Sequence, residues 1–289
     1  MPDLSKNEMA QQYGFALAFL KSDKSLWKLF NQAVDGSWAA DRFVAKLKNT
    51  SWYKKNGESA RQYELLRTSD PASFRQKRGA LGAQIKDAAA QLGATVSGPM
   101  ITRITQNAMK FGWNDAQIRD TLAQYVKATN GVYRGQAGND IETVRQTAYR
   151  NGIKISKATE QSWAKAIASG NQTADFYERQ VRSMAKSLAP GFAKELDSGI
   201  DLQDIVSPFI ESKAKILEMN PADIDLFDKD IRNAISGTKT DGSPGSQSLW
   251  QFERAMRNSP AWLKTQNAQD SSMSVGKKVL QDMGFQGVG

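Results

Sequence analysis

The sequence predicts an all-α fold, an irregular multi-helix bundle of short helical hairpins followed by a tethered C-terminal helical module. Apolar residues recur at helical spacing along most of the chain, whereas β-branched residues never alternate over a strand-length window. Glycine, proline and polar capping residues interrupt the pattern at short intervals, as at Asp70-Pro71 and Gly93. We therefore expect many short helices and almost no sheet.

The N-terminal helical region is predicted to span residues 1–93. Its helices are expected at 4–21, 26–35, 39–47, 52–67 and 71–92. Pro71 suits the first position of the last of these helices, because the N–H group that proline lacks has no partner there in any helix. Gly93 follows the last apolar residue of that helix and is expected to end it.

The central helical region is predicted to span residues 94–236, and the loop at 94–99 is the best candidate for the boundary before it. Helices are expected at 100–111, 139–151, 157–167, 201–219 and 221–235, the last with Ile224, Phe227, Ile231 and Ile235 on one face. Pro208 should kink or split the fourth of them after Val206 or Ser207, because proline removes a helical hydrogen bond.

Three junctions in the central region share one pattern. Each has a glycine that stops a helix, a polar capping candidate and an apolar residue six positions after the glycine, and the glycines are Gly112, Gly170 and Gly199. Either the three junctions use the same capping residues independently, or they belong to a helical hairpin that is repeated in degenerate form. The irregular spacing between the junctions argues against a solenoid.

Residues 237–246 contain Gly242, Pro244 and Gly245 and are predicted to form a flexible linker. The linker would isolate residues 247–289 as a C-terminal helical docking module. This module holds Trp250, Phe252, Trp262 and Lys264, which we expect to be interaction residues. A segment of this length is too short to bury two tryptophans alone, so they pack either on the body or on a partner.

Composition excludes several classes of chemistry. The 289 residues include no cysteine and no histidine, which removes disulfides, thiolate nucleophiles, histidine-based triads and ordinary zinc sites. No apolar run reaches the length of a membrane-spanning helix. The formal net charge of +9 favours an acidic partner, either a nucleic acid or an acidic protein surface.

An enzyme built from this chain would depend on carboxylates. Glu211-Ser212 and Glu58-Ser59 each resemble the glutamate-serine pair of lytic transglycosylases, which makes a peptidoglycan lyase one alternative. The similarity stops at two residues, since no glycine-rich segment follows Glu211.

We interpret the acidic residues Asp223, Asp225, Asp228 and Asp230 as a solvated helix start rather than a calcium site. We expect the protein to bind no cofactor.

A basic segment supports a second alternative, nucleic-acid binding. Its cations include Lys54, Lys55, Arg75 and Arg78, which face few acidic residues in the same span. Such a surface can neutralise phosphates or dock on an acidic neighbour. The segment contains no recognition-helix motif, and a solvated basic face is the commoner explanation.

Both ends of the chain carry distinctive short motifs. At the C-terminus they are Leu249-Trp250-Gln251-Phe252-Glu253, the segment 260–270 and Val279-Leu280-Gln281-Asp282-Met283-Gly284-Phe285. At the N-terminus they are Phe19-Leu20-Lys21-Ser22-Asp23 with Leu26-Trp27-Lys28-Leu29-Phe30, and Asn49-Thr50-Ser51-Trp52-Tyr53. In these motifs the chain resembles virion proteins of tailed bacteriophages, mostly from actinobacterial hosts.

The resemblance implies a non-enzymatic structural role in the virion, as a tail, tail-tip or internal protein delivered with the genome. Its partners would be other virion proteins, with several copies or a homo-oligomer in each particle and possible contact with phage DNA. The protein would be made in the host cytoplasm and located in the virion.

Overall fold

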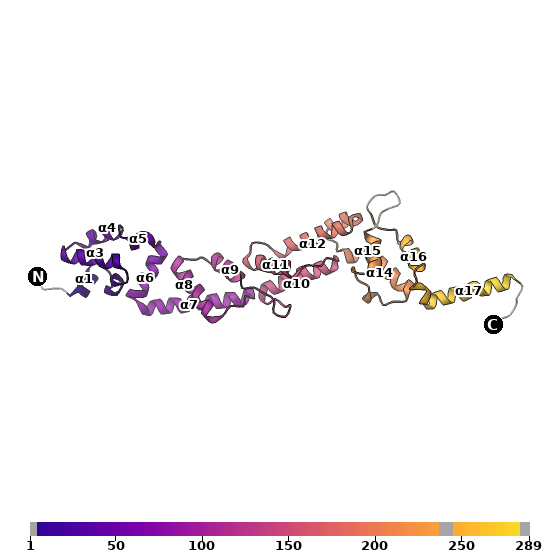
Figure 1. Cartoon of the computed structure of the whole chain (residues 1–289), viewed down its shortest axis with the longest axis horizontal. Coiled ribbons are helices and arrows are strands. Elements are labelled where there is room, and N and C mark those ends of the chain that lie inside the picture. The colour runs from indigo at the N-terminus through magenta and orange to yellow at the C-terminus, as the bar shows by residue number, and fades with distance from the viewer. Residues whose placement is uncertain (1–4, 237–244, 284–289) are drawn as a thin grey trace. The chain divides into compact units, whose positions relative to one another are not determined.

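A computed structural model describes residues 5–236 and 245–283. Within these residues the chain forms seventeen α-helices, three short 3-10 helices and no strand (Figure 1). The all-α prediction is therefore confirmed. None of the described helices is both long and apolar enough to cross a membrane.

The chain divides into two compact units. Unit 1 comprises Met1–Asn139 and Ala164–Asn171, and unit 2 comprises Asp140–Trp163 and Gln172–Gly289. Neither unit is a continuous piece of chain, because α10 (Gly135–Arg150) and α11 (Lys157–Ser169) each contribute to both. The loop 94–99 lies inside unit 1, where the Thr95 amide donates to the Tyr125 carbonyl at 3.0 Å.

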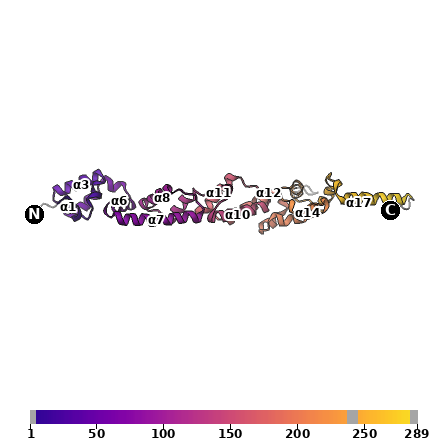
Figure 2. The same cartoon turned by 90° about the horizontal axis from the view of Figure 1, so that it is seen from below.

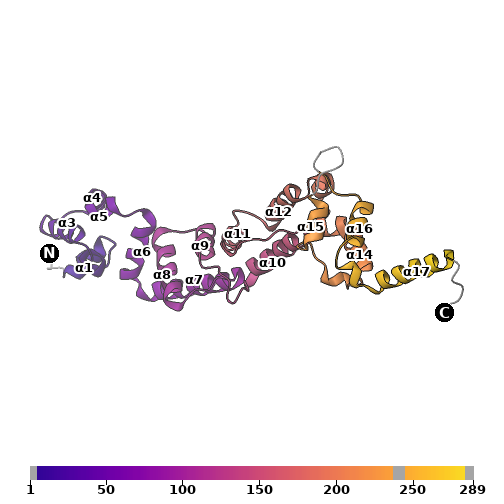
Figure 3. The same ribbon diagram turned by 45° about the vertical axis from the view of Figure 1, so that its right-hand side comes forward.

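Unit 1 consists of short helices and one long helix, which is α7. Its complete helices are α1 (Lys6–Gln12), α2 (Leu17–Lys21), α3 (Lys24–Asp35), α4 (Ala40–Leu47), α5 (Ser51–Lys55), α6 (Glu58–Ser69), α7 (Pro71–Leu92), α8 (Gly98–Phe111) and α9 (Asp115–Ala123). Helix α7 contacts α8 and α9 and lies beside them in Figures 1 and 3, and Figure 2 shows it beside α8.

The ends of α7 match their prediction. Asp70 caps its start by accepting a hydrogen bond from the Ser73 amide at 3.0 Å, and Pro71 is the first helical residue. Gly93 ends α7 with a φ of +78°, and a Cβ there would lie 1.8 Å from the Arg134 carbonyl oxygen. Only glycine satisfies both constraints, because it has no Cβ.

The helix predicted at 4–21 is instead two helices that meet at Gly14, which has a φ of +79°. Tyr13 explains the turn, since its ring stacks on Phe43 with the centroids 4.6 Å apart. Its hydroxyl donates to the Trp38 carbonyl at 2.9 Å. A straight helix would hold this side chain away from both partners, which lie far along the sequence.

The helix predicted at 52–67 is likewise divided, at Asn56 and Gly57. Asn56 is extended, with φ −106° and ψ 125°, and Gly57 precedes α6 as its capping residue. The Arg61 guanidinium donates to the Asn56 and Tyr53 carbonyls at 2.6 and 3.1 Å. These bonds satisfy carbonyls that a continuous helix would have used internally.

Unit 2 is organised around one helix, α14 (Leu202–Leu217). Its other elements, besides its parts of α10 and α11, are α12 (Ala174–Leu188), η1 (Pro190–Phe192), α13 (Ala193–Asp197), η2 (Pro221–Asp223), α15 (Lys229–Ile235), α16 (Leu249–Arg257), η3 (Trp262–Lys264) and α17 (Gln266–Asp282). Val206, Phe209, Ile210 and Ala214 of α14 lie buried in a core that also includes α15 and α16.

Pro208 does not split this helix, so that part of the prediction is wrong. The helix is continuous from Leu202 to Leu217 with Pro208 inside it. The carbonyl that loses its hydrogen bond belongs to Asp204, an exposed residue, where water can replace the missing donor. Because the helix continues, Phe209 and Ile210 are buried, and their burial stabilises the protein by more than the missing hydrogen bond costs.

The helix predicted at 221–235 is replaced by a short 3-10 turn, an irregular segment and α15. Asp225 accepts a hydrogen bond from the Phe227 amide at 2.8 Å, and Asp228 caps α15 by accepting from the Asp230 and Ile231 amides. Aspartate favours such local bonds over helix continuation.

The linker predicted at residues 237–246 lies mostly outside the described residues.

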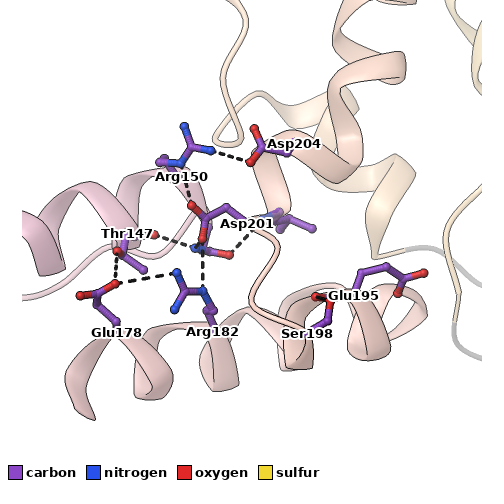
Figure 4. A network of polar contacts seen from close by, with 10 residues as sticks. Thr147, Arg150, Glu178, Arg182, Glu195, Ser198, Asp201 and Asp204 are labelled. Atoms are coloured by element: carbon purple, nitrogen blue, oxygen red, sulfur yellow. Dashed lines mark hydrogen bonds and ion pairs between the residues drawn. The ribbon is translucent and has the colours of Figure 1, made fainter. Parts of the chain in front are cut away.

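A polar network joins α10, α12 and the start of α14 within unit 2 (Figure 4). Asp201 lies at its centre. The carboxylate accepts hydrogen bonds from the Arg150 Nε at 2.7 Å, the Asn151 Nδ2 at 2.9 Å and the Arg182 Nε at 3.3 Å. Arg150 also reaches Asp204 on the first turn of α14.

Asn151 is the fully buried member of this network. Its amide donates to the Thr147 carbonyl at 2.8 Å, and its Oδ1 accepts from the Leu202 backbone amide at 3.0 Å. Asp201 precedes α14 but makes no capping bond of its own. Asn151 therefore supplies the cap that α14 needs, from the turn that follows α10.

We predict that Asn151→Ala destabilises unit 2 by about 2–3 kcal/mol, because it leaves the buried Leu202 amide without an acceptor. Urea denaturation followed by far-UV circular dichroism measures the change. Asn233→Ala, at an exposed position of α15, is the matched control and should change stability little. Equal effects of the two substitutions would contradict the capping role of Asn151.

Candidate functional site

The C-terminal part of unit 2 contains half of the predicted interaction residues, namely Trp250, Phe252, Trp262 and Lys264. Helix α16 begins at a reciprocal cap, in which the Gln251 amide donates to the Ser248 hydroxyl at 3.3 Å and the Ser248 amide donates to Gln251 Oε1 at 2.9 Å. This start places Phe252 and Met256, four residues apart, on one face of the helix.

That face of α16 belongs to the core. Phe252 is 1% exposed and meets Phe209 of α14 edge-to-face, with ring centroids 5.4 Å apart. Trp262 is partly buried against the same core, and the Ser212 hydroxyl of α14 donates to Glu253 Oε1 at 2.9 Å. Phe252 and Trp262 therefore pack on the body of the protein, and Phe252 offers no surface to a partner.

The opposite side of this region leaves large apolar side chains exposed. Trp250 is 65% exposed, with the Arg254 guanidinium 5.6 Å from its ring centroid, and Leu263 of η3 is 68% exposed. Lys264 is also exposed. Trp250 and Lys264 thus remain available for contact, and Leu263 joins them although the sequence did not single it out.

Helix α17 extends this exposed apolar surface. Thr265 and Ala268 are buried, but every residue from Gln269 to Met283 is exposed. Five apolar residues of that stretch fall within an arc of about 160° around the helix axis. They are Met273, Val275, Val279, Leu280 and Met283, and we call this arc the α17 apolar face.

A helix of this composition is poorly stable by itself. The segment from Ser271 to Gly276 contains three serines, a valine and a glycine, all weaker helix formers than alanine or leucine. Isolated helices of this length are marginal in water. The α17 apolar face is therefore suited to a partner that covers it, because burial would stabilise the helix.

Glu218 holds the first turn of α17 to the end of α14. It occupies the left-handed position after α14, with a φ of +54°. Its two carboxylate oxygens accept hydrogen bonds from the Gln266 and Asn267 amides, each at 2.8 Å. These amides have no partner inside α17, so the carboxylate satisfies them and complements the helix dipole.

An ion cluster around the buried Lys213 joins α14 to the start of α15. The Lys213 Nζ lies 2.7 Å from Asp228 Oδ1 and 2.6 Å from Asp230 Oδ2, and the lysine is 5% exposed. Burial alone lowers the pKa of Lys213, but the hydrogen bonds to the two aspartates outweigh it and raise the pKa above its usual value. The lysine therefore stays charged across the neutral range.

This cluster accounts for two of the four acidic residues that were considered as a calcium site. Asp225 is bonded to the Phe227 amide, as described above. Among the described residues, no group of three or more carboxylates is arranged to hold a metal ion. Lys213 is a structural residue that sequence analysis missed, although its position in an apolar stripe with Ile210 and Ile216 indicated that it would be buried.

The predicted basic residues lie on two helices of unit 1, with α6 between them in the chain. Lys54 and Lys55 are exposed on α5, and Arg75 is exposed on α7. Arg78 lies over the Phe74 ring, 5.9 Å from its centroid. No salt bridge joins any of these four cations to another residue that the structure describes.

Glu211 lies at the edge of an open groove in unit 2. The groove is also lined by Ser212, Lys215, Glu253 and Trp262, so it contains two carboxylates and a partly buried tryptophan. Glu211 itself is exposed and accepts a bond from the Ser207 hydroxyl at 3.1 Å. The groove has charged walls rather than the apolar surroundings that keep a general acid protonated.

Comparisons of the chain with protein families, with characterised proteins and with solved structures gave no match.

We predict that Glu218→Gln loosens the start of α17, because an amide side chain has one acceptor oxygen where the carboxylate has two. Hydrogen exchange of the Gln266 and Asn267 amides should accelerate about tenfold. Glu195→Gln is the matched control, since this exposed glutamate lies on α13, away from α17 in the chain. Unchanged exchange in Glu218→Gln would contradict the tether.

Proposed function

We propose that this protein is a non-enzymatic structural component of a tailed-phage virion and that it acts through protein–protein assembly contacts. The observation that carries the proposal is the α17 apolar face, which the described residues leave exposed. Trp250 and Leu263 add to the exposed apolar surface of the same C-terminal region. Exposed apolar surface of this extent is typical of a docking site.

The phage assignment depends on the sequence resemblance at the two ends of the chain. It proposes a tail, tail-tip or internal protein, made in the host cytoplasm and incorporated into the particle in several copies. The C-terminal docking surface is formed by the exposed residues Trp250, Leu263 and Lys264 with the α17 apolar face. Helix α16 is not a separate module, because its buried face, with Phe252 and Met256, forms part of the core of unit 2.

The structure also suggests where the docking surface can be removed without exposing the core. Ala268 is the last buried residue of the described chain. Removing the whole segment after 237 would uncover Phe209 and its neighbours, whereas removing the residues after Ala268 would not. Point substitutions on α17 are milder still.

We predict that Met273→Asp with Leu280→Asp greatly reduces incorporation of the protein into particles from its own source. The reason is that two charges would have to be buried in the docking contact. Immunoblots of gradient-purified particles measure incorporation, and truncation after Ala268 should have the same effect.

The matched control is Ser274→Asp with Gln281→Asp, which adds the same charge at the same seven-residue spacing on the opposite face of α17. This control should be incorporated normally. The proposal fails if control and test variants behave alike, or if the purified chain clears a cell-wall zymogram and Glu211→Gln abolishes the clearing. The latter result would favour the peptidoglycan lyase alternative.

Nucleic-acid binding is a second candidate function. The observation that favours it is the exposure of Lys54, Lys55 and Arg75 without a salt bridge to any described residue. Cations in this state can release counterions from a phosphate backbone, in line with the net charge of +9. Contact with phage DNA is compatible with an internal virion protein.

If this second function operates, duplex DNA binding should weaken steeply with salt, and Lys54→Gln with Lys55→Gln should reduce the salt slope by about two. Fluorescence anisotropy over a range of salt concentrations measures the slope. Lys277→Gln with Lys278→Gln removes the same charge from α17 and should leave the slope unchanged. Binding that is absent, or independent of salt, would exclude DNA as a partner.

A further inference from the structure

The groove beside Glu211 takes no part in the proposed docking surface. It lies entirely within unit 2, where α14 and α16 pack side by side (Figure 3). Its volume is about 690 Å³, which falls in the range of about 300–1,000 Å³ that small-molecule sites occupy. The groove is therefore large enough for a ligand of its own.

Two helices supply most of the lining of this groove. The lining residues of α14, which include Glu211, Ser212 and Lys215, form one stripe at helical spacing. Those of α16 are spaced four residues apart and include Glu253 and Arg257. The rest of the lining comes from η3 and from the first turns of α17.

The charges of the groove balance. Glu211 and Lys215 of α14 and Glu253 and Arg257 of α16 are its charged lining residues, so the lining carries no net formal charge. A phosphate polymer would meet two carboxylates there, and a metal ion would meet two cations. The groove therefore favours an uncharged ligand over a nucleic acid or an ion.

The groove also offers both donors and acceptors. Glu253 accepts from the Ser212 hydroxyl at 2.9 Å and from the Arg257 Nη1 at 3.5 Å. A carboxylate has about four acceptor sites, so Glu253 can accept further hydrogen bonds. Lys215 is exposed and forms no salt bridge with another residue that the structure describes. A ligand with many hydroxyl groups can use both, because each hydroxyl donates and accepts.

Trp262 adds an aromatic surface to the lining. It packs partly against the core of unit 2 and also lines the groove. Its indole N–H donates to no other residue in the described part of the chain, so it is available to a ligand oxygen. The C–H faces of a sugar ring are apolar and pack on aromatic rings, while the hydroxyls at the ring edge form hydrogen bonds.

An amphipathic helix is less suited to this groove than a sugar. Helix-in-groove recognition needs an apolar floor along several turns. Here the polar bond between Ser212 and Glu253 interrupts the lining, and Ile216 is the one apolar lining residue that is buried among those the structure describes.

We propose that this groove binds a neutral saccharide, with a sugar ring packed on Trp262 and hydroxyls bonded to Glu253 and Lys215. The inference goes beyond the proposed function, because the ligand and the surface both differ from those of the docking contact. It concerns binding alone and includes no reaction step.

Isothermal titration calorimetry of the full chain tests the proposal with two neutral probes, tri-N-acetylchitotriose and maltotriose. At least one should bind in a saturable way. Tighter binding of the first would indicate an N-acetylated amino-sugar polymer as the source of the ligand, and tighter binding of the second a plain hexose polymer. No binding of either probe at about 10 mM would overturn the proposal.

Trp262→Ala should weaken binding of the better probe at least about tenfold, because it removes the stacking surface. Trp113→Ala is the matched control, since Trp113 is also partly buried in the structure but lies in unit 1. The control should bind the probe normally even where its melting temperature falls. Equal loss of binding in the two variants would overturn the role of Trp262.

A second variant leaves the core intact. Glu211→Ala with Lys215→Ala removes two exposed groups without changing the net charge, and binding should weaken at least about fivefold. Lys194→Ala with Glu195→Ala makes the same change on α13, outside the groove, and should have no effect. Unchanged binding in the first pair would show that the saccharide binds elsewhere and would overturn the proposal.

Trigalacturonate, in which every sugar ring carries a carboxylate, tests the preference for an uncharged ligand. It should bind no more tightly than the better neutral probe. Tighter binding that weakens as salt is added would make the groove an anion site and overturn the proposal.

Discussion

Unit 2 depends on one partly buried carboxylate, that of Asp201, which joins three helices through donors at α10 and α12 and through its own position before α14. Burial raises the pKa of this group, but the hydrogen bonds from Arg150 and Asn151 and the nearby charge of Arg182 lower it further, so the pKa lies below its ordinary value. The carboxylate therefore stabilises the fold above the unfolded pKa of Asp, near 3.8, and this contribution disappears as the pH falls through the lower folded value.

The elements of the C-terminal region are attached in turn to α14 and to Glu218, the residue that follows it. Phe209 packs on α16, Lys213 binds the start of α15, and Glu218 binds the start of α17. These three contacts are of different kinds, namely aromatic packing, an ion cluster and a carboxylate on helix amides. Each has one partner on α14 or directly after it, so the start of α17 is positioned by a residue about fifty positions earlier in the chain.

Local patterns predicted the fold class and the ends of α7, because capping and helix-stopping residues act over a few positions. They failed where a distant partner decided the outcome, as at Tyr13, which turns the chain to reach Phe43 and Trp38. They also wrongly allowed a break of α14 at Pro208, where the helix stays continuous and buries the neighbouring residues Phe209 and Ile210.

The candidate site shows the same division between local and distant causes. The amphipathic character of α16 is visible in the sequence, but which of its aromatic residues face the core is decided by α14. Phe252 is buried and Trp250 is exposed, two residues apart, and neither residue type alone predicts this. The Glu218 contact joins residues about fifty positions apart and has no sequence signal, because an exposed glutamate after a helix is common.

The interleaved chain order of the two units has a consequence for synthesis. Unit 1 needs residues 164–171, where the Ala168 carbonyl accepts a hydrogen bond from Arg119 Nε at 2.8 Å. The ribosome delivers that segment only after residues 140–163, which belong to unit 2. Unit 1 therefore cannot complete its folding as an independent first domain during translation. Both units finish folding late, because they use overlapping stretches of the nascent chain.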